Sequence, residues 1–264
     1  MQKPLADLLR PESISEMVGQ HHLLDEGSVF RKSIEANHLT NMVFYGPPGV
    51  GKTTLANIIA KNSKLSLYKL NGTNASIDDI KTVIKEADSF LNGNGVLLYL
   101  DEIQYLNKKQ QQSLLEFVES GDITLIASTT ENPYFYIYPA LLSRCTVFEF
   151  KALKVDDIKE GLLRACDKLG LKIEEDALET LALASNGDMR KALNNLDFVY
   201  GAINGRENGD STPECPTVKE VNAMLDRLIS DKELIPHMCD RIDELKKLGR
   251  YNGAYECVKL AAGK

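Results

Sequence analysis

The spacing of the apolar residues divides the chain into two parts. Within residues 25–151, short and mostly continuous apolar runs alternate with segments whose apolar residues recur every three or four positions. The five runs are NMVFYG (41–46), LSLYKLN (65–71), GVLLYLD (95–101), DITLIAST (122–129) and CTVFEF (145–150). Such runs are typical of strands, most clearly of strands buried on both faces, and the segments between them are typical of helices. The alternation therefore predicts an α/β domain with a mostly parallel sheet.

After residue 151 the strand pattern stops and only helical spacing continues. Three helices are predicted, at residues 155–170, 174–185 and 188–203. We therefore expect a small all-helical domain at residues 152–203. Residues 204–216 are rich in Gly, Pro, Asn and Ser and predict a linker, whereas residues 217–264 predict a C-terminal helical segment. Residues 1–24 form a separate N-terminal segment.

The segment GPPGVGKTT (46–54) lies between a predicted strand and a predicted helix and has the spacing of a phosphate-binding loop. Its glycines let backbone N–H groups face the β-phosphate of ATP, and the helix N-terminus adds partial positive charge. Lys52 would reach the β- and γ-phosphates, and Thr53 would bind Mg²⁺. The alternative is a glycine turn before a helix, which does not require this lysine and threonine. The residues expected to bind ATP are Gly46, Pro47, Pro48, Gly49, Val50, Gly51, Lys52, Thr53 and Thr54.

Two acidic residues follow the third predicted strand, in VLLYLDE (96–102). A buried parallel strand brings Asp101 to the carboxyl edge of the sheet, which is the ligand-binding edge of an open α/β fold. We expect Asp101 to bind Mg²⁺ together with Thr53, and Glu102 to polarise an attacking water. The alternative is that both acids cap the following helix. The order Asp-Glu favours hydrolysis over kinase chemistry.

These motifs, with ASTT (127–130) ending the fourth predicted strand, resemble those of AAA+ ATPases. The resemblance implies an α/β phosphate-loop domain followed by a helical lid, with ATP and Mg²⁺ as cofactors. It implies that Thr130, in preference to its neighbour Thr129, contacts the γ-phosphate and the attacking water. It also implies that Arg190, in NGDMRKALNNLD (186–197), reaches the nucleotide from the lid; the alternative is an arginine on a solvated helix face.

Two further implications of the resemblance concern the edges of the site. The entry segment LLRPESISEMVGQ (8–20) is similar to the segment that lies near the adenine in this superfamily. The residues placed there by the resemblance are Arg10, Pro11, Val18, Gly19 and Gln20. Asn71 ends the second predicted strand, where relatives carry a polar residue that restrains the catalytic glutamate.

A narrower resemblance covers residues 5–203. The segments LRPESISEMVGQHHLL (9–24), EIQYLNKKQQQSLLEFVESGDITLIASTTENPYFYIYPALLSRC (102–145) and NGDMRKALNNL (186–196) are similar to the RarA/MgsA family, the bacterial relatives of Werner-helicase-interacting protein. This implies Mg²⁺-dependent ATP hydrolysis coupled to DNA transactions at stalled or damaged replication forks. The implied partners are forked DNA or junctions of single and double strands, other copies of the chain, and single-strand-binding protein. The C-terminal region is shorter than or divergent from the family pattern, which leaves the ring size open.

Arg144 ends the segment TTENPYFYIYPALLSR (129–144). By resemblance it points into the nucleotide site of a neighbouring copy, where its fixed positive charge would stabilise charge developing on the γ-phosphate. The alternative is a surface arginine paired with a nearby acid. The role of the aromatic residues before it is left open between base stacking and packing, with packing favoured. The pair Lys108 and Lys109 is left open between a DNA contact and a solvated surface. The aromatic residues are Tyr134, Phe135, Tyr136 and Tyr138.

Composition restricts the remaining classes of function. A net charge of -7 over 264 residues argues against coating of nucleic acid by bulk charge, although it permits local contact. No apolar run is long enough to cross a bilayer, so we expect no membrane partner. Five dispersed cysteines and the lack of a secretory signal predict a cytoplasmic protein with reduced thiols.

Four rival functions share the predicted site or part of it. A clamp-loader subunit and a Holliday-junction motor would use the same ATPase residues. A nucleotide-switched adaptor would use ATP only to gate binding of protein partners. A small-molecule kinase is disfavoured because it would leave Arg144 and Arg190 without a role.

Overall fold

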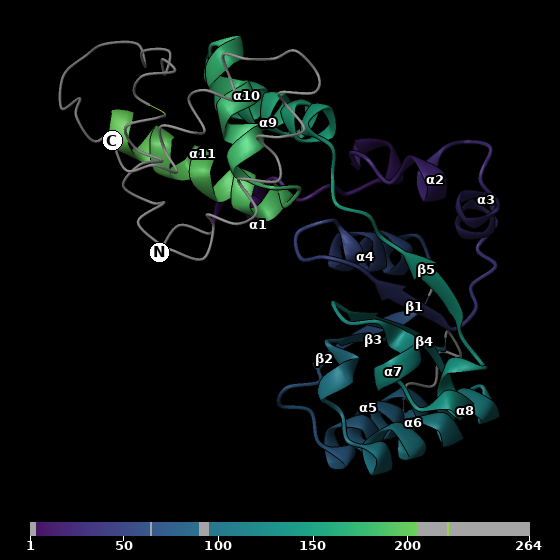
Figure 1. Ribbon diagram of the computed structural model, residues 1–264. Coiled ribbons are helices and arrows are strands. Elements are labelled where there is room, and N and C mark those ends of the chain that lie inside the picture. Colours follow the sequence, from purple (N-terminus) through teal and green to yellow (C-terminus); the bar gives the residue numbers. More distant parts are fainter. Residues whose placement is uncertain (1–3, 64, 90–94, 205–220, 222–264) are drawn as a thin grey trace.

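The computed structural model describes residues 4–63, 65–89, 95–204 and 221 (Figure 1). Its centre is a sheet of five parallel strands in the order β2-β3-β4-β1-β5. The strands are β1 (Met42–Tyr45), β2 (Ser66–Asn71), β3 (Val96–Asp101), β4 (Ile123–Thr129) and β5 (Thr146–Glu149). All five predicted strands and the parallel α/β fold are therefore confirmed.

Helices cover both faces of the sheet, because alternate side chains of each buried strand point to opposite faces. Leu98 and Leu100 of β3 join the core under α5, α6 and α8, whereas Leu97 and Tyr99 join the core under α2, α3 and α4. Figure 1 shows these two layers on either side of the strands. The helices are α2 (His21–Leu24), α3 (Val29–Glu35), α4 (Lys52–Asn62), α5 (Ile77–Ser89), α6 (Lys108–Ser120), α7 (Pro133–Tyr136) and α8 (Pro139–Leu142), with short 3-10 helices η1 (Ile14–Glu16) and η2 (Ile103–Tyr105).

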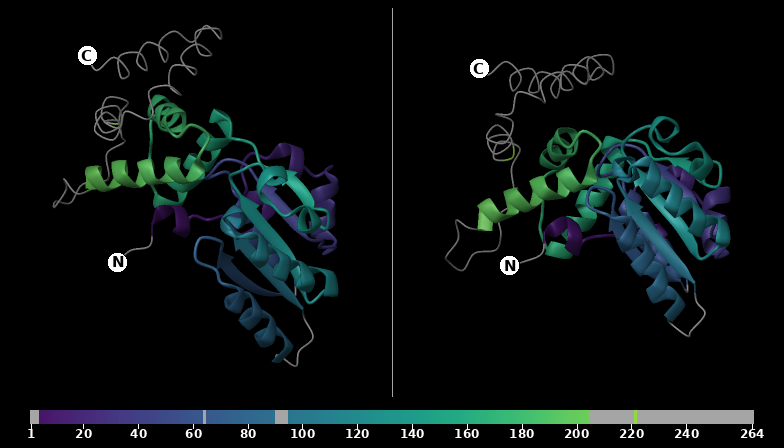
Figure 2. Two further views of the ribbon diagram at one scale, coloured as in Figure 1. Left: turned by 60° about the horizontal axis from the view of Figure 1, so that its bottom comes forward. Right: turned by 90° about the horizontal axis from the view of Figure 1, so that it is seen from below.

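The helices after the sheet have a third apolar core of their own. They are α9 (Val155–Leu169), α10 (Glu175–Ala184) and α11 (Met189–Asn204), and all three predicted helices are present. Leu5 of the N-terminal helix α1 (Leu5–Leu8) is buried in this core, as is Val221. The N-terminal segment thus runs from the helical part of the chain to the sheet, and Figure 2 shows α1 beside α11.

The predicted domain boundaries stay predictions. Apart from Asn204 and Val221, the predicted linker and C-terminal segment lie outside the described residues. None of the helices in the described ranges combines the length and the apolar character needed to cross a bilayer.

Candidate active site

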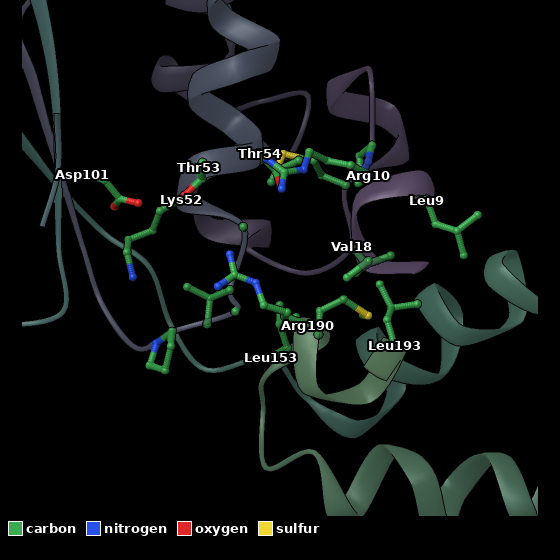
Figure 3. Close-up of a pocket in the computed structure, with 18 of the residues that line it drawn as sticks. Leu9, Arg10, Val18, Lys52, Thr53, Thr54, Asp101, Leu153, Arg190 and Leu193 are labelled. Carbon is green, nitrogen blue, oxygen red and sulfur yellow. The ribbon is translucent and has the colours of Figure 1, made fainter. Parts of the chain in front are cut away.

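A cavity lies at the carboxyl edge of the sheet, where the N-terminal segment, the loop after β1, the ends of β3 and β4, and α11 meet (Figure 3). Ala6, Leu9, Arg10, Pro11, Met17 and Val18 line it from the N-terminal segment, and Pro48, Gly49, Val50, Gly51, Lys52, Thr53 and Thr54 line it from the loop and α4. Asp101, Glu102 and Thr130 line it from the strand ends, and Leu153, Met189, Arg190 and Leu193 from the helical part. The residues from the N-terminal segment and the helical part are mostly apolar, with Arg10 and Arg190 as the exceptions, whereas Lys52, Asp101 and Glu102 carry charge on the side of the sheet.

The loop after β1 is held from two sides, and two glycines allow this. The backbone of Gly46 has φ +144°, and a Cβ there would lie 2.0 Å from the Phe150 carbonyl oxygen. Gly49 has φ +67°, and its Cβ would lie 1.7 Å from Asp188 Oδ1. The Met189 N–H donates to the Gly49 carbonyl at 3.1 Å. Side chains at these two positions would push the loop away from β5 and α11.

Lys52 opens α4 and is almost fully buried, with 8% of its surface exposed. Its Nζ donates to the carbonyl oxygens of Gly46 at 2.6 Å and Pro47 at 2.7 Å, although neither of these residues lines the cavity. Burial lowers the pKa of the Lys52 ammonium, and the charges of Glu102 and Asp101 oppose this. A buried ammonium that has only neutral carbonyl partners is well placed to bind an anionic phosphate.

A hydrogen-bonded group of four oxygens connects the two expected Mg²⁺ ligands. The Tyr99 hydroxyl lies 2.9 Å from Thr53 Oγ1, 2.9 Å from Ser128 Oγ and 3.2 Å from Asp101 Oδ1. Ser128 Oγ also donates to Asp101 Oδ1. Burial, together with the charge of Asp101, raises the pKa of the Tyr99 phenol, so the hydroxyl keeps its proton. Thr53 and Asp101 are thereby held on adjacent elements facing one cavity.

The donor set of this cavity fits Mg²⁺. Thr53 and Asp101 offer a hydroxyl and a carboxylate, which are hard oxygen ligands, on the same side of the cavity as Lys52 (Figure 3). Among the described residues, no three His, Cys, Asp or Glu side chains gather in a way that could hold a metal ion. Such a pair of ligands suits a cation that is bound largely by phosphate oxygens and water.

Glu102 has an unusual backbone conformation at the end of β3. Its φ of +53° places it in the left-handed region, where it precedes η2. The Glu102 carboxylate accepts a hydrogen bond from the Gln104 amide, and it lines the cavity. Left-handed backbone at a non-glycine residue is strained and occurs often at functional sites. Thr130 also lines the cavity, whereas Thr129 is buried and its hydroxyl accepts from the Glu131 N–H at 3.0 Å.

The residues expected near the adenine fall into two groups. Arg10, Pro11 and Val18 line the cavity. Gly19 and Gln20 are buried behind it. The Gln20 amide donates to the Lys151 carbonyl at 2.7 Å and accepts from the Lys151 N–H at 2.9 Å. A contact of these residues with adenine stays a prediction.

Arg190 extends from α11 toward the phosphate loop, as Figure 3 shows. Asn71 ends β2 directly beside Asp101 in the sheet, and its exposed side chain accepts through Oδ1 from the Thr73 N–H at 2.9 Å and hydroxyl at 2.7 Å. It does not line the cavity. The predicted roles of both residues stay predictions: Arg190 lines the cavity, and Asn71 lies next to Asp101 at its edge.

Arg144 lies on the surface after α8, away from the cavity of its own chain. Its guanidinium forms an ion pair with Glu119 of α6 and donates to the Ala140 carbonyl at 2.7 Å. Within one chain, Arg144 therefore has the surface pairing that was the alternative interpretation. Its role toward a second copy stays a prediction.

The aromatic residues before Arg144 also divide into two groups. Tyr138 packs against the core on one face of the sheet, with the Lys108 ammonium 5.5 Å from its ring centre. Tyr134, Phe135 and Tyr136 of α7 are exposed, with 82% of Phe135 accessible. The favoured interpretation is packing onto the chain's own domain or onto a neighbouring subunit. Tyr138 packs onto its own domain, and for the three exposed residues the interpretation stays a prediction.

The chain is similar in sequence to an ATPase family and to several curated proteins. Residues 42–153 match the model of the ATPase family associated with various cellular activities (AAA). Over 214 residues the chain is 39% identical to replication-associated recombination protein A of Haemophilus influenzae, a match that covers 78% of this chain and 48% of that protein. For the Escherichia coli K12 protein of the same name, the identity is 38% and the coverage is 75% and 46%. Residues 42–153 thus form an AAA ATPase domain, and the chain is similar to replication-associated recombination protein A over about three quarters of its length.

Other matches extend this result. ATPase WRNIP1 of Dictyostelium discoideum is 39% identical, over 75% of this chain and 24% of its own. A solved structure of a Thermotoga maritima RuvB mutant superposes with a TM-score of 0.73 at 25% identity, over 91% of this chain and 81% of that chain. Residues 197–262 match a domain of unknown function, DUF6938. The chain spans half or less of the length of the curated relatives named here.

Sequence reasoning missed Tyr99 and Ser128, and it missed most of the apolar residues that line the cavity. Tyr99 carries a hydroxyl in an otherwise aliphatic strand, which is a signal that a buried polar partner exists. The apolar residues have no comparable signal, because they also look like ordinary core positions. The missed apolar residues are Ala6, Leu9, Met17, Leu153, Met189 and Leu193.

Proposed function

We propose that the chain binds ATP with Mg²⁺ in this cavity and hydrolyses it. The observation that carries the proposal is the meeting of Lys52, Thr53, Asp101 and Glu102 at one edge of the sheet, opposite Arg190. The adenine and ribose would lie along the apolar wall formed by the N-terminal segment and α11. The triphosphate would lie on the loop at the N-terminus of α4, where N–H groups and the helix dipole favour anions.

The side chains then have separate tasks. Lys52 would exchange its two carbonyl partners for phosphate oxygens. Thr53 and Asp101 would hold Mg²⁺, which when bound offsets charge on the β- and γ-phosphates. Glu102 would orient and polarise the attacking water, with Thr130 as a second hydrogen-bonding group. Arg190 would add positive charge from the helical part.

We further propose that a complete site needs a second copy of the chain. Arg144 is exposed on the surface and does not line the cavity of its own chain, so it could act only on a neighbour. Its present partner is Glu119, and an exposed ion pair of this kind contributes only about 0.2–1 kcal/mol. Exchange of Glu119 for a phosphate of the neighbouring site is therefore energetically feasible.

The process served by hydrolysis is proposed from the relatives. The curated relatives are named for replication-associated recombination, which supports ATP hydrolysis coupled to DNA transactions at stalled or damaged forks. The RuvB structures, one of them titled a Holliday junction branch migration motor, favour movement of DNA junctions as a second candidate. Single-strand-binding protein is a candidate partner.

The test uses two variants of the site, at Lys52 and Glu102, and one variant of Arg144. Lys52→Ala should lose ATP turnover, because no other described side chain supplies a buried ammonium to the phosphate loop. Glu102→Gln should bind ATP with nearly parental affinity and hydrolyse it about 100-fold or more slowly, the usual range for loss of a general base. Arg144→Ala should bind ATP normally but hydrolyse it slowly, and mixing it with Lys52→Ala protein should restore part of the turnover. Full hydrolysis by Lys52→Ala would refute the assignment of the site.

DNA coupling needs a separate measurement. ATP turnover should rise when forked DNA is added, relative to an equal mass of blunt duplex. An ATP turnover rate that is the same with and without DNA, together with no DNA binding at low salt, would instead support a nucleotide-switched adaptor.

A further inference from the structure

A tyrosine hydroxyl and a serine hydroxyl lie directly beneath the two residues that face the phosphate side of the cavity. Tyr99 belongs to β3 and Ser128 to the neighbouring strand β4, and both are buried, with 2% and 0% of their surfaces exposed. The Tyr99 ring packs in the same apolar core as Leu97 and Ile126. Its hydroxyl is the polar end of a side chain that is otherwise a core residue, and it points at the functional groups of Thr53 and Asp101.

The hydrogens of this network can be assigned from the contacts. Ser128 donates its proton to Asp101 Oδ1, because a carboxylate is only an acceptor. Tyr99 then donates its one proton to Asp101 Oδ1 or to Ser128 Oγ. In either case the Tyr99 oxygen keeps a lone pair free to accept the Thr53 proton. This direction leaves the remaining lone pairs of Thr53 Oγ1 free for a cation.

We propose that Tyr99, together with Ser128, is a positioning residue for the divalent cation of the nucleotide site. Tyr99 orients the Thr53 hydroxyl so that oxygen rather than hydrogen faces the cation. Ser128, alone or together with Tyr99, also fixes Asp101 through Oδ1, which leaves Oδ2 to bind the cation or its water shell. The proposal rests on the proposed binding of Mg²⁺ and ATP, and it adds two residues to which the sequence motifs assign no role.

The Tyr99 hydroxyl has more hydrogen-bonding neighbours than a buried phenol needs. One acceptor would suffice for the Tyr99 proton, but the hydroxyl has three oxygen neighbours, two of them on residues that line the cavity. The three neighbours come from α4, β3 and β4, so the hydroxyl connects three elements at the point where the site is formed.

The test measures cation dependence of nucleotide binding, without hydrolysis. A fluorescent ADP analogue is titrated into the parent chain, Tyr99→Phe and Ser128→Ala, in EDTA and in a series of Mg²⁺ concentrations. Tyr68→Phe is the matched control, because it removes a hydroxyl from a half-buried tyrosine of the adjacent strand β2 that is not among the network's contacts. Thermal unfolding of each variant checks that the fold is retained.

Tyr99→Phe should bind the analogue in EDTA as tightly as the parent does. Its half-saturating Mg²⁺ concentration should rise about 3- to 10-fold, the range expected for loss of one hydrogen bond, and Ser128→Ala should shift it in the same direction. Tyr68→Phe should follow the parent. A Tyr99→Phe titration that superimposes on the parent curve would overturn the proposal, as would an equal loss of affinity with and without Mg²⁺. A parent chain that binds no nucleotide in either condition would overturn the proposed function as well.

Discussion

Gln20 offers a sharp test, because its observed contacts differ from the role that the resemblance implies. Its side-chain amide makes a two-way pair with the backbone of Lys151, at 2.7 Å and 2.9 Å, and lies 3.4 Å from the Val50 carbonyl. Gln20 itself is 5% exposed. It thus joins the N-terminal segment to the residue that follows β5 and to the phosphate loop.

Replacing Gln20 by Ala removes both strong hydrogen bonds and leaves the N–H and C=O of Lys151 without these partners. Each bond contributes about 1 kcal/mol, and an orphaned buried group costs somewhat more. Because the Lys151 groups are only partly buried, we expect a loss of about 2–3 kcal/mol in the free energy of unfolding. Gln20→Glu keeps the acceptor for the Lys151 N–H but loses the donor, so its loss should be smaller than that of the alanine variant.

The assay is urea unfolding followed by circular dichroism, with ATP affinity measured on the same samples. Gln112→Ala is the control, because Gln112 is an exposed glutamine on α6 and should change stability by less than about 0.5 kcal/mol. If Gln20→Ala lowered ATP affinity but left the unfolding midpoint at the parental value, the interpretation of Gln20 as a structural link between the N-terminal segment and Lys151 would be refuted. Direct contact of Gln20 with the nucleotide would then be supported.

Two further predictions concern charged groups on the surface. Glu119→Gln should release Arg144 and raise ATP turnover about 1.5- to 5-fold, the factor that corresponds to an exposed ion pair, when turnover is measured at a protein concentration too low for full assembly. The melting temperature should hardly change. Turnover at or below the parental rate would count against exchange of the pair. Hydrogen bonds to Asp157 and then Asp25 raise the pKa of His21 above its ordinary 6.5, so its contribution to stability should be complete at about pH 5.5 and disappear as the pH rises through the folded-state value. Melting curves of the parent and His21→Gln should therefore differ at about pH 5.5 and coincide at about pH 8.5; a difference that grows with pH would refute the assignment.

The main elements of the fold could be predicted from the sequence because burial and spacing agree in them. β3 and β4 are covered on both faces and almost wholly buried, so β3 and the first five residues of β4 form mainly apolar runs. The helices α7 and α8 were missed because each has four residues, which is too short for a periodic pattern. Both begin with proline, which indicates a helix start but also a turn.

The candidate site was predictable where one local segment carries the chemistry, as in the phosphate loop and in Asp101-Glu102. It was not predictable where the chemistry depends on strand register. Leu100 pairs with Ala127 in adjacent strands, which brings the following residues, Asp101 and Ser128, side by side. That pairing joins residues 27 positions apart, and no spacing rule within either strand indicates it.

The contacts of the phosphate loop explain why the three parts of the site belong together. The Gly49 carbonyl accepts from the Met189 N–H, and the next residue along α11 is Arg190. The start of α11, and with it the backbone of Arg190, is therefore tied to the same loop that would hold the phosphates. Gln20 reaches the carbonyl of Val50, the neighbour of Gly49, from the N-terminal segment. If bound phosphate shifted the loop, α11 and the N-terminal segment would therefore move with it, because each is hydrogen-bonded to one of two adjacent loop residues.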